Sequence, residues 1–363
     1  MAKKIEELDK NFSISSAAKD VDANYFDVRE EPFSVYGLYD YKNQSEFKRL
    51  PDEIAKNTND GVAHLYLCTA GGRVRFSTDS PYILIKAKLG HIGRMPHIPL
   101  VSSAGFDLYI DNPLDNTSRY YRSFVPPYNM ENGYISIIKF SSEKKKRYIT
   151  INFPSYSGVC ELFVGIAPDA TLGKGMKYRD SLPVVYYGSS ITQGGCASRP
   201  GNSYQNIISR RTNTDYINLG FSGSGKGEDI IAEYMATIPM SAFVSDYDHN
   251  APTPEHLEAT HLKLYKTIRK SNPDLPYIMI SRYDFDSEYD KNIIRRNIIA
   301  DTYRYARSIG DKNVYFIDGA GIFRGPYEDM CTVDGCHPND IGFALLADAI
   351  GAELKRAFSQ NLF

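Results

Sequence analysis

The chain has 363 residues, of which 42% are hydrophobic and 24% are charged, a balance typical of a globular protein. This length predicts two domains, each able to bury its own core. The formal net charge of −2 offers no basic surface for a nucleic acid. No segment approaches the ~20 consecutive apolar residues of a membrane helix, so we expect neither a nucleic-acid nor a membrane partner. We interpret the basic run at 144–147, between two strand-like segments, as a solvated hairpin turn.

The five cysteines are scattered along the chain without the CxxC spacing of a metal site: Cys68, Cys160, Cys196, Cys331 and Cys336. The first seven residues contain no apolar stretch of the kind found in a secretion signal. We therefore expect a cytoplasmic protein, or an exported one if a signal peptide has been removed. We also expect neither a metal nor a cofactor.

Between about residues 25 and 167, apolar residues recur with a period of two, which is typical of β-strands. In the run 83–89, for example, Lys86 and Lys88 lie between apolar residues. Clusters of Gly, Pro, Asn and Asp separate such runs. The pattern predicts an antiparallel β-sandwich of the jelly-roll kind, in a domain that we assign to residues 1–175.

From residue 176 to residue 363, short apolar runs alternate with longer helical patterns. The apolar runs predict strands at 182–187, 215–219, 242–246, 277–281 and 314–317. The helical patterns predict helices at 203–211, 228–237, 254–270, 291–309 and 339–358. Such an alternation forms a parallel sheet covered by helices on both faces, and its ligands lie beyond the carboxyl ends of the strands. Polar motifs at the ends of these strands are therefore the candidates for a functional site.

The first motif of this kind pairs the end of strand 182–187 with a loop near the C-terminus. Ser189 and Ser190 follow the strand, and Asp334 precedes His337 by three residues just before the last helix. A serine hydroxyl becomes a nucleophile when an imidazole takes its proton, and a carboxylate can fix the tautomer of that imidazole. Both segments could be ordinary turns, but their shared position beyond strand ends favours a serine hydrolase.

A glycine-rich loop, residues 220–227, follows the second predicted strand. Its backbone N–H groups could bind an anion, either a phosphate or an oxyanion. The loop is close to a P-loop, but Gly227 stands where that motif needs the Ser or Thr that binds magnesium. A nucleotide hydrolase is therefore the less favoured alternative.

The segment after the third predicted strand contains His249 and Asn250. It begins like a calcium-binding loop, but Ala251 and Leu257 replace the required glycine and glutamate, so we reject a calcium site. The amide of Asn250 can point toward the same space as the glycine-rich loop. His249 competes with His337 as a candidate general base.

In this order, the motifs resemble the SGNH (GDSL-like) hydrolases. Ser190 matches the serine of the first block, Gly223 the glycine of the second and Asn250 the asparagine of the third. Asp334 and His337 match the Asp-x-x-His of the last block. The resemblance implies a flavodoxin-like SGNH domain with a five-stranded parallel sheet, in the part that we assign to residues 176–363.

The N-terminal half carries a second resemblance. Residues 103–109, Ser-Ala-Gly-Phe-Asp-Leu-Tyr, look like the GxDLY signature of a β-domain that precedes one branch of SGNH hydrolases. The chain also departs from the family pattern at two positions. Ser189 stands where Gly-Asp-Ser-Leu has its acid, and Ala251 stands where Gly-x-Asn-Asp has its aspartate.

The resemblance implies a carboxylic ester hydrolase, most often one that removes O-acetyl groups from a carbohydrate. Ser190 would be the nucleophile, His337 the acid–base catalyst and Asp334 the residue that orients the imidazole. The oxyanion hole would consist of the N–H groups of Ser190 and Gly223 and the amide of Asn250. The alternative enzyme is an acyltransferase that uses the same residues. The non-enzymatic alternative is a carbohydrate-binding protein with an inactive hydrolase domain. The expected partner is an acetylated oligosaccharide or another small ester. The sequence leaves open whether the chain forms a homo-oligomer.

A loop with two prolines, residues 95–99, precedes the GxDLY signature. A rigid, irregular loop could reach across the domain interface and contact the substrate through Met95 and His97. His249 is a further candidate for a substrate contact. The alternative is that the β-domain only packs against the second domain.

Overall fold

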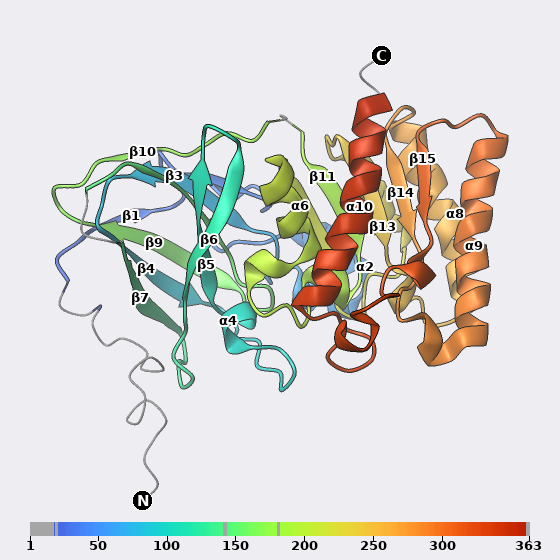
Figure 1. Cartoon of the computed structure of the whole chain (residues 1–363), viewed down its shortest axis with the longest axis horizontal. Coiled ribbons are helices and arrows are strands. Elements are labelled where there is room, and N and C mark those ends of the chain that lie inside the picture. The colour runs from blue at the N-terminus through green and yellow to red at the C-terminus, as the bar shows by residue number, and fades with distance from the viewer. Residues whose placement is uncertain (1–17, 19–20, 141–143, 180–181, 361–363) are drawn as a thin grey trace, which may run out of the picture.

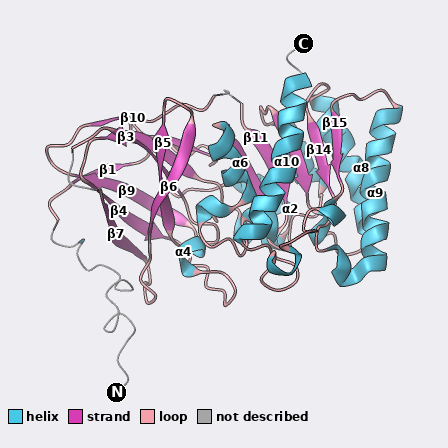
Figure 2. Ribbon diagram, viewed as in Figure 1, coloured by secondary structure: helices cyan, strands magenta, loops and turns pink. Residues whose placement is uncertain are grey.

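The computed structural model describes residues 18, 21–140, 144–179 and 182–360. Two parts lie side by side, a β-rich part from the first half of the chain and an α/β part from the second (Figure 1). Helices flank the strands of the α/β part, whereas the β-rich part contains mostly strands (Figure 2). Within the described part of the chain, every helix is too short or too polar to cross a lipid bilayer.

Two antiparallel sheets form the β-rich part, and their residues meet in one core. Ile83 and Ile85 of one sheet belong to the same buried cluster as Val74 and Phe76 of the other. The predicted antiparallel β-domain is thus confirmed. The first sheet has the order β1 (Asn24–Asp27), β9 (Val159–Ile166), β4 (Tyr82–Leu89) and β7 (Gly133–Lys139). The second has the order β10 (Leu172–Lys174), β3 (Arg73–Thr78), β8 (Arg147–Asn152), β5 (Phe106–Asn112) and β6 (Thr117–Phe124), with β2 (Ser34–Tyr36) also paired to β3.

The predicted hairpin at residues 144–147 is wrong. The strands on either side of this segment, β7 and β8, belong to different sheets, because β7 pairs with β4 and β8 pairs with β3 and β5. The basic run therefore lies in a connection between the two sheets. Lys144 is half exposed there and forms an ion pair with Asp169 at 3.0 Å.

The polar face of β3 does not face water. Arg73 and Arg75 are only 1% and 3% exposed. Arg73 forms an ion pair with Asp215, and its guanidinium lies 3.8 Å from the centre of the Tyr216 ring. Since Asp215 and Tyr216 belong to the α/β part, the face of β3 opposite the sandwich core forms the interface between the two parts.

In the described part of the first half, three helices were not predicted: α2 (Asp52–Thr58), α3 (Asp60–Leu65) and α4 (Leu100–Ser103). Two of them serve the α/β part. Ala55 of α2 and Val62 of α3 are fully buried in the same cluster as Val185 and Leu219 of the parallel sheet. The first half of the chain therefore supplies part of the cover of that sheet.

The α/β part contains the predicted five-stranded parallel sheet. The strands lie in the order β12 (Tyr216–Gly220), β11 (Val184–Gly188), β13 (Ala242–Asp246), β14 (Tyr277–Ile280) and β15 (Val314–Ile317). The second strand of the chain thus lies outside the first, as in flavodoxin-like folds. Three adjacent strands end together: Gly188 of β11 lies opposite Gly220 of β12 on one side and Asp246 of β13 on the other. The loops that follow these three strands therefore meet at one edge.

Alternate residues of β11 point to opposite faces of the sheet. Val184 and Tyr186 pack in the cluster of α6 (Tyr204–Thr212) and α10 (Asp340–Gln360). Val185 and Tyr187 pack in the cluster of the other helices, α7 (Asp229–Thr237), α8 (Pro254–Ser271) and α9 (Tyr289–Ser308). The five predicted helices are confirmed, with ends shifted by a few residues at most.

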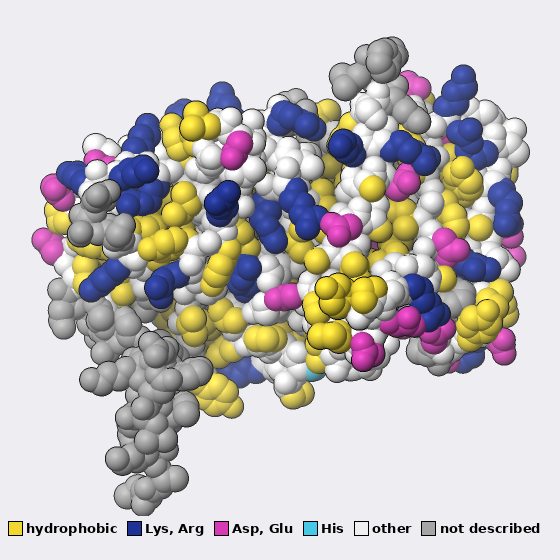
Figure 3. All heavy atoms as spheres, viewed as in Figure 1, with side chains coloured by type: hydrophobic (Ala, Val, Ile, Leu, Met, Phe, Trp, Pro, Cys, Tyr) yellow, Lys and Arg dark blue, Asp and Glu magenta, His cyan; other side chains and the backbone are white. Residues whose placement is uncertain are grey.

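The charged side chains on the face shown in Figure 3 are mixed. Lys and Arg side chains are spread over both parts, with Asp and Glu side chains among them. This distribution agrees with the small net charge of −2. This face therefore presents no concentrated basic surface to a polyanion.

Candidate active site

The site begins at the end of β11, where the chain turns into the short helix α5 (Ser190–Gln193). Ser189 is fully buried, and its Oγ accepts a hydrogen bond from the Ile191 N–H at 3.2 Å, which caps the helix. Ser190 is partly exposed, and its Oγ lies 2.8 Å from Nε2 of His337. Of the two adjacent serines, Ser190 is therefore the one that contacts an imidazole.

A tight loop before α10 holds this imidazole. Nδ1 of His337 lies 2.7 Å from Oδ2 of Asp334, and Oδ1 of Asp334 accepts the backbone N–H groups of Cys336 and His337 at 3.1 and 2.7 Å. Partial burial acts to raise the pKa of Asp334, but the hydrogen bonds outweigh it and lower that pKa below its usual value. The carboxylate is thus ionised at neutral pH and favours the tautomer with the proton on Nδ1. That tautomer leaves Nε2 free to accept the proton of Ser190.

The glycine-rich loop after β12 lies beside α5. The Ser222 N–H donates to Oε1 of Gln193 at 3.0 Å, which ties the loop to the helix of Ser190. Gly223 adopts a φ of +65° at the tip, where an added Cβ would meet no atom within 4 Å. Among the residues described, its N–H has no hydrogen-bond partner. This N–H group is therefore available to a bound oxyanion.

Asn250 lies in the 3-10 helix η4 (Asp248–Asn250), directly after β13. Its Nδ2 donates to the carbonyl of Phe221 at 2.8 Å, at the start of the glycine-rich loop. An amide carries two hydrogens, so a second one is available for a ligand. Arg295 stabilises the position of η4, because its Nη1 donates a hydrogen bond to Oδ1 of Asp248 at 3.0 Å.

Two family profiles match the sequence. The GDSL-like lipase/acylhydrolase family matches residues 181–355, and GxDLY, the N-terminal domain of SGNH-type esterases, matches residues 23–172. The chain belongs to the GDSL-like, SGNH-type hydrolases. The resemblance that the sequence motifs indicated is thus confirmed for both halves.

Solved structures share the two-part architecture. A Bacteroides ovatus protein described as a GDSL-like lipase is 28% identical, with a TM-score of 0.82 over 92% of this chain and 98% of its own. The salicylyl-acyltransferase SsfX3 from a tetracycline biosynthetic pathway is 19% identical, with a TM-score of 0.73 over 92% of this chain and 97% of its own. An acetyl xylan esterase from the rumen bacterium Butyrivibrio proteoclasticus is 13% identical, with a TM-score of 0.58 over 93% of this chain and 99% of its own. The latter two share the fold at low identity. A search of curated proteins by sequence gave no match.

His249 of this GDSL-like hydrolase takes part in a different pair. Its Nε2 lies 3.0 Å from Oδ1 of Asp284, and Oδ2 of the same carboxylate binds Arg282 at 2.7 Å. The imidazole packs against the ring of Tyr283, with a centre-to-centre distance of 4.7 Å. The structure therefore brings His337 to Ser190 and holds His249 against the end of the neighbouring strand.

The buried side chain of Asp246 contacts the helix that carries Ser190. Its Oδ2 accepts hydrogen bonds from the hydroxyls of Thr192 and Tyr204, each at 3.0 Å. Burial raises the pKa of Asp246 to about 6. The hydroxyl of Thr192 is thereby fixed two residues after Ser190, at the cost of burying a carboxylate.

The GxDLY domain contacts the turn that carries Ser190 directly. The hydroxyl of Tyr156 donates to the carbonyl of Ser190 at 3.2 Å, and Nε2 of Gln193 donates to the carbonyl of Ser155 at 3.1 Å. Gln193 thus joins three segments: the helix α5, the glycine-rich loop and the β-domain. The first half of the chain therefore positions Ser190 as well as packing against the second half.

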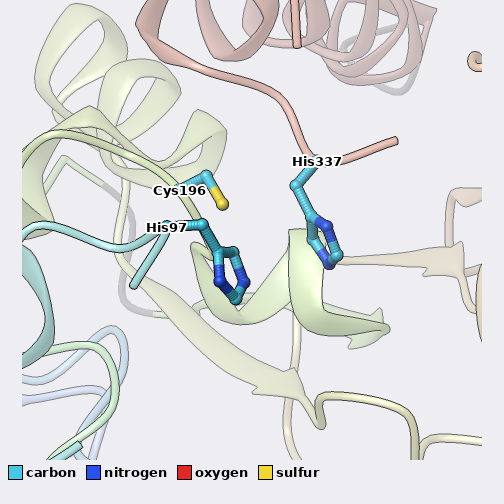
Figure 4. Close-up of side chains that lie close together, drawn as sticks. All are labelled: His97, Cys196 and His337. Carbon is cyan, nitrogen blue, oxygen red and sulfur yellow. The ribbon is translucent and has the colours of Figure 1, made fainter. Parts of the chain in front are cut away.

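The loop with two prolines also reaches the site. Met95 and Ile98 pack with Tyr156 and Cys196 in a small apolar cluster at the interface. The ring of His97 lies 5.8 Å from the ring of His337, centre to centre (Figure 4). Of the residues suggested as substrate contacts, His97 is the one that the structure places beside the triad candidates.

The signature of the GxDLY domain binds the segment that follows helix α5. Asp107 is completely buried, and its Oδ2 accepts the Gly201 N–H at 2.8 Å and Nη1 of Arg199 at 3.2 Å. Its Oδ1 accepts the amide of Asn152 at 2.7 Å, and the hydroxyl of Tyr109 also bonds Arg199. A Cβ at Gly201 would overlap the hydroxyl of Tyr109, so the close approach requires glycine.

The same segment continues to the loop of His337. Asp340, the first residue of α10, accepts the Ser198 N–H at 2.9 Å and the amide of Asn202 at 2.7 Å. His337 lies three residues before Asp340. Hydrogen bonds therefore connect the GxDLY signature through residues 198–202 to the loop that carries the imidazole.

The residues that support this site were not predicted from the sequence. Gln193 and Asp340 stand next to recognised motifs, and a polar residue inside a buried turn or at the first position of a helix could have indicated each of them. Tyr156 carries no such signal, because its partner Ser190 is 34 residues away in the sequence.

Proposed function

We propose that this GDSL-like hydrolase is a serine esterase that removes acetyl groups from an O-acetylated carbohydrate. The observation that carries the proposal is the continuous hydrogen-bonded series from Ser190 through His337 to Asp334, with distances of 2.8 and 2.7 Å. A serine, an imidazole and an ionised carboxylate in this order are the groups required for acyl transfer through an acyl-enzyme.

In the proposed acylation step, Oγ of Ser190 attacks the ester carbonyl while Nε2 of His337 takes its proton. Asp334 holds the Nδ1–H and stabilises the imidazolium that forms. The tetrahedral intermediate collapses as Nε2 gives the proton to the departing sugar oxygen. Water then attacks the acetyl-enzyme with the same imidazole as base, which releases acetate and restores Ser190.

The oxyanion of that intermediate would be bound by three donors: the N–H groups of Ser190 and Gly223 and the second amide hydrogen of Asn250. Ser190 lies at the first position of α5, where a backbone N–H has no partner within the helix. Each donor of this kind is worth roughly 3 kcal/mol of the barrier. Gln193 and Phe221 support the proposal, because their hydrogen bonds fix the two loops that carry the donors.

The carbohydrate class rests on two kinds of support. The same two-part fold occurs in a family-two carbohydrate esterase of Clostridium thermocellum in complex with cellohexaose, which is 14% identical over 90% of this chain, with a TM-score of 0.62. In this chain, Tyr327 is 53% exposed on the segment that leads to Asp334, and Met330 beside it is 51% exposed. An exposed tyrosine ring can stack on a sugar ring.

An acyltransferase is the second candidate. The same acyl-enzyme would pass its acyl group to a hydroxyl acceptor in place of water, as the name of SsfX3 states for a protein of this fold. Mass spectrometry of acetylated oligosaccharides after incubation with the enzyme tests both candidates. Loss of ~42 Da per acetyl group, with release of acetate, supports the esterase. Transfer of the acetyl group to an added alcohol or sugar supports the transferase, and no change in any substrate contradicts both.

A further inference from the structure

Three side chains able to bind a metal ion meet at the proposed triad, and one of them, His337, belongs to it. His97 comes from the GxDLY domain, Cys196 from the segment after α5 and His337 from the loop before α10. One nitrogen of each imidazole and the sulfur of the thiol all lie within 4.8 Å of one another. In Figure 4 the two rings and the thiol surround a common space. Imidazole nitrogens and a thiolate are preferred ligands of zinc, with bonds of about 2.0–2.3 Å, so a small inward movement would bring all three into contact with one ion.

His337 is already prepared as a metal ligand. Its Nδ1 bonds Asp334 at 2.7 Å, so Nε2 is the nitrogen left for an ion. A histidine that binds zinc commonly donates its other N–H to a carboxylate, which orients the ring and increases its basicity. The arrangement that suits His337 as a general base therefore also suits it as a zinc ligand.

Cys196 is held rigidly in its place. It is 4% exposed, packs with Ile98 and Tyr156, and has a φ of +69°, which is rare for a residue other than glycine. Burial raises the pKa of Cys196 to about 12, so the side chain is a thiol and not a reactive thiolate at neutral pH. His97, in contrast, is exposed on its loop and can rotate toward an ion.

We propose that His97, Cys196 and His337 form a site for Zn²⁺, or another thiophilic divalent cation, whose occupation reversibly inhibits the enzyme. This inference rests on the proposed function, in which His337 is the base. The ion accepts one lone pair from each imidazole and one from the sulfur, and the thiol proton passes to solvent without any change of oxidation state. With an ion on Nε2, the imidazole cannot take the proton of Ser190, so acylation stops until the ion leaves.

A second group of metal-binding atoms within 4.8 Å consists of His249, Asp284 and Cys336. Its members are less suited to a cation. His249 and Asp284 already pair with each other at 3.0 Å, and the guanidinium of Arg282 lies 2.7 Å from the same carboxylate. The positive charge of Arg282 opposes a divalent cation there, and this group serves as the internal comparison.

The experiment uses the full chain and two readouts. The first is hydrolysis of p-nitrophenyl acetate during titration with Zn²⁺, followed by EDTA. The second is the near-ultraviolet absorbance of the protein with Co²⁺, in which a thiolate ligand gives an intense charge-transfer band. Both readouts are applied to the wild type, to Cys196→Ser and to the matched control Cys336→Ser.

We expect Zn²⁺ to inhibit the wild type and EDTA to restore its activity, whereas EDTA alone should not lower it. Cys196→Ser should need at least ~10-fold more Zn²⁺ for half inhibition and should lose the cobalt–thiolate band, while Cys336→Ser should keep both. The proposal is overturned if the wild type gives no such band, or if Cys336→Ser and not Cys196→Ser removes it. Should the wild type hydrolyse no ester, the cobalt band still decides on the metal site, and the proposed function fails separately.

Discussion

The connection from the GxDLY signature to His337 predicts that a buried residue of the β-domain affects catalysis. Asp107→Asn is the smallest change that tests it. The substitution removes the negative charge that faces Arg199 at 3.2 Å. It also replaces one acceptor oxygen by an NH₂ group, which is a donor. That group would face another donor, either the Gly201 N–H or the amide of Asn152.

The expected loss of stability follows from these contacts. Removing one partner of a buried ion pair costs about 3–5 kcal/mol. The Arg199 side chain keeps 19% of its surface exposed and can turn toward water, and the remaining oxygen still accepts one hydrogen bond. We therefore expect a loss of ~2–3 kcal/mol in the free energy of unfolding, or about 3 °C in Tm.

Activity should fall for a separate reason. If residues 198–202 relax, Asp340 loses the donors that hold the start of α10, and the loop of His337 shifts. A misplacement of about 1 Å can cost up to ~100-fold in rate, so a fall of roughly 10-fold in kcat is expected well below Tm. The assay is hydrolysis of p-nitrophenyl acetate, with urea unfolding measured on the same protein.

Asp111→Asn is the matched control. Asp111 lies on the same strand, is 3% exposed and pairs with Arg75 at 3.3 Å, but its contacts lead away from His337 toward Asn213. It should lose stability to a similar extent while kcat stays near that of the wild type. Equal kcat losses in both variants, or an unchanged kcat in Asp107→Asn, would refute the positioning role of the signature.

Three further predictions concern the site itself. His337→Ala should lower kcat about 10³-fold or more, whereas an equal loss in His249→Ala with a mild effect of His337→Ala would assign the base to the other imidazole. The pKa of Asp246 is raised to about 6 from an unfolded value of about 4, so its carboxyl stabilises the fold below pH 4 and loses this contribution as the pH rises through 6. The difference in unfolding free energy between wild type and Asp246→Asn should thus fall by ~2 kcal/mol between pH 4 and pH 7 in urea titrations, and a difference independent of pH would contradict the account. Changing Met95 and His97 to Ala should lower activity on an acetylated oligosaccharide but leave hydrolysis of p-nitrophenyl acetate nearly unchanged. If activity on both substrates stays equal to that of the wild type, the loop 95–99 only packs against the second domain.

Local patterns explain why the sequence predicted the parallel sheet and its motifs. Ser190, Asn250 and His337 each stand directly after or before a regular element, and a parallel sheet gathers such positions at one edge. The sequence could therefore predict their proximity without any knowledge of side-chain packing. The family resemblance already favoured Ser190 over Ser189, and the structure adds a physical reason, because the hydroxyl of Ser189 is buried as the cap of α5.

Non-local contacts explain what the sequence could not predict. The hairpin interpretation of 144–147 was wrong because neighbouring strands in the chain can join different sheets, and the partner strand leaves no mark in the segment itself. The helices α2 and α3 are only 7 and 6 residues long, too short for a clear helical period. The contact between Asp107 and Gly201 spans 94 residues, so its role at the domain interface follows only from the fold.

The central claim is that Ser190 is the nucleophile of a serine esterase, and covalent labelling tests it most directly. A fluorophosphonate reacts with a serine that an imidazole activates, and mass spectrometry locates the labelled residue. We predict one label on Ser190 in the wild type, none in Ser190→Ala, and retained labelling in Ser189→Ala if the helix cap is not disrupted, as circular dichroism can verify. Labelling that persists in Ser190→Ala and disappears in a folded Ser189→Ala would contradict the account.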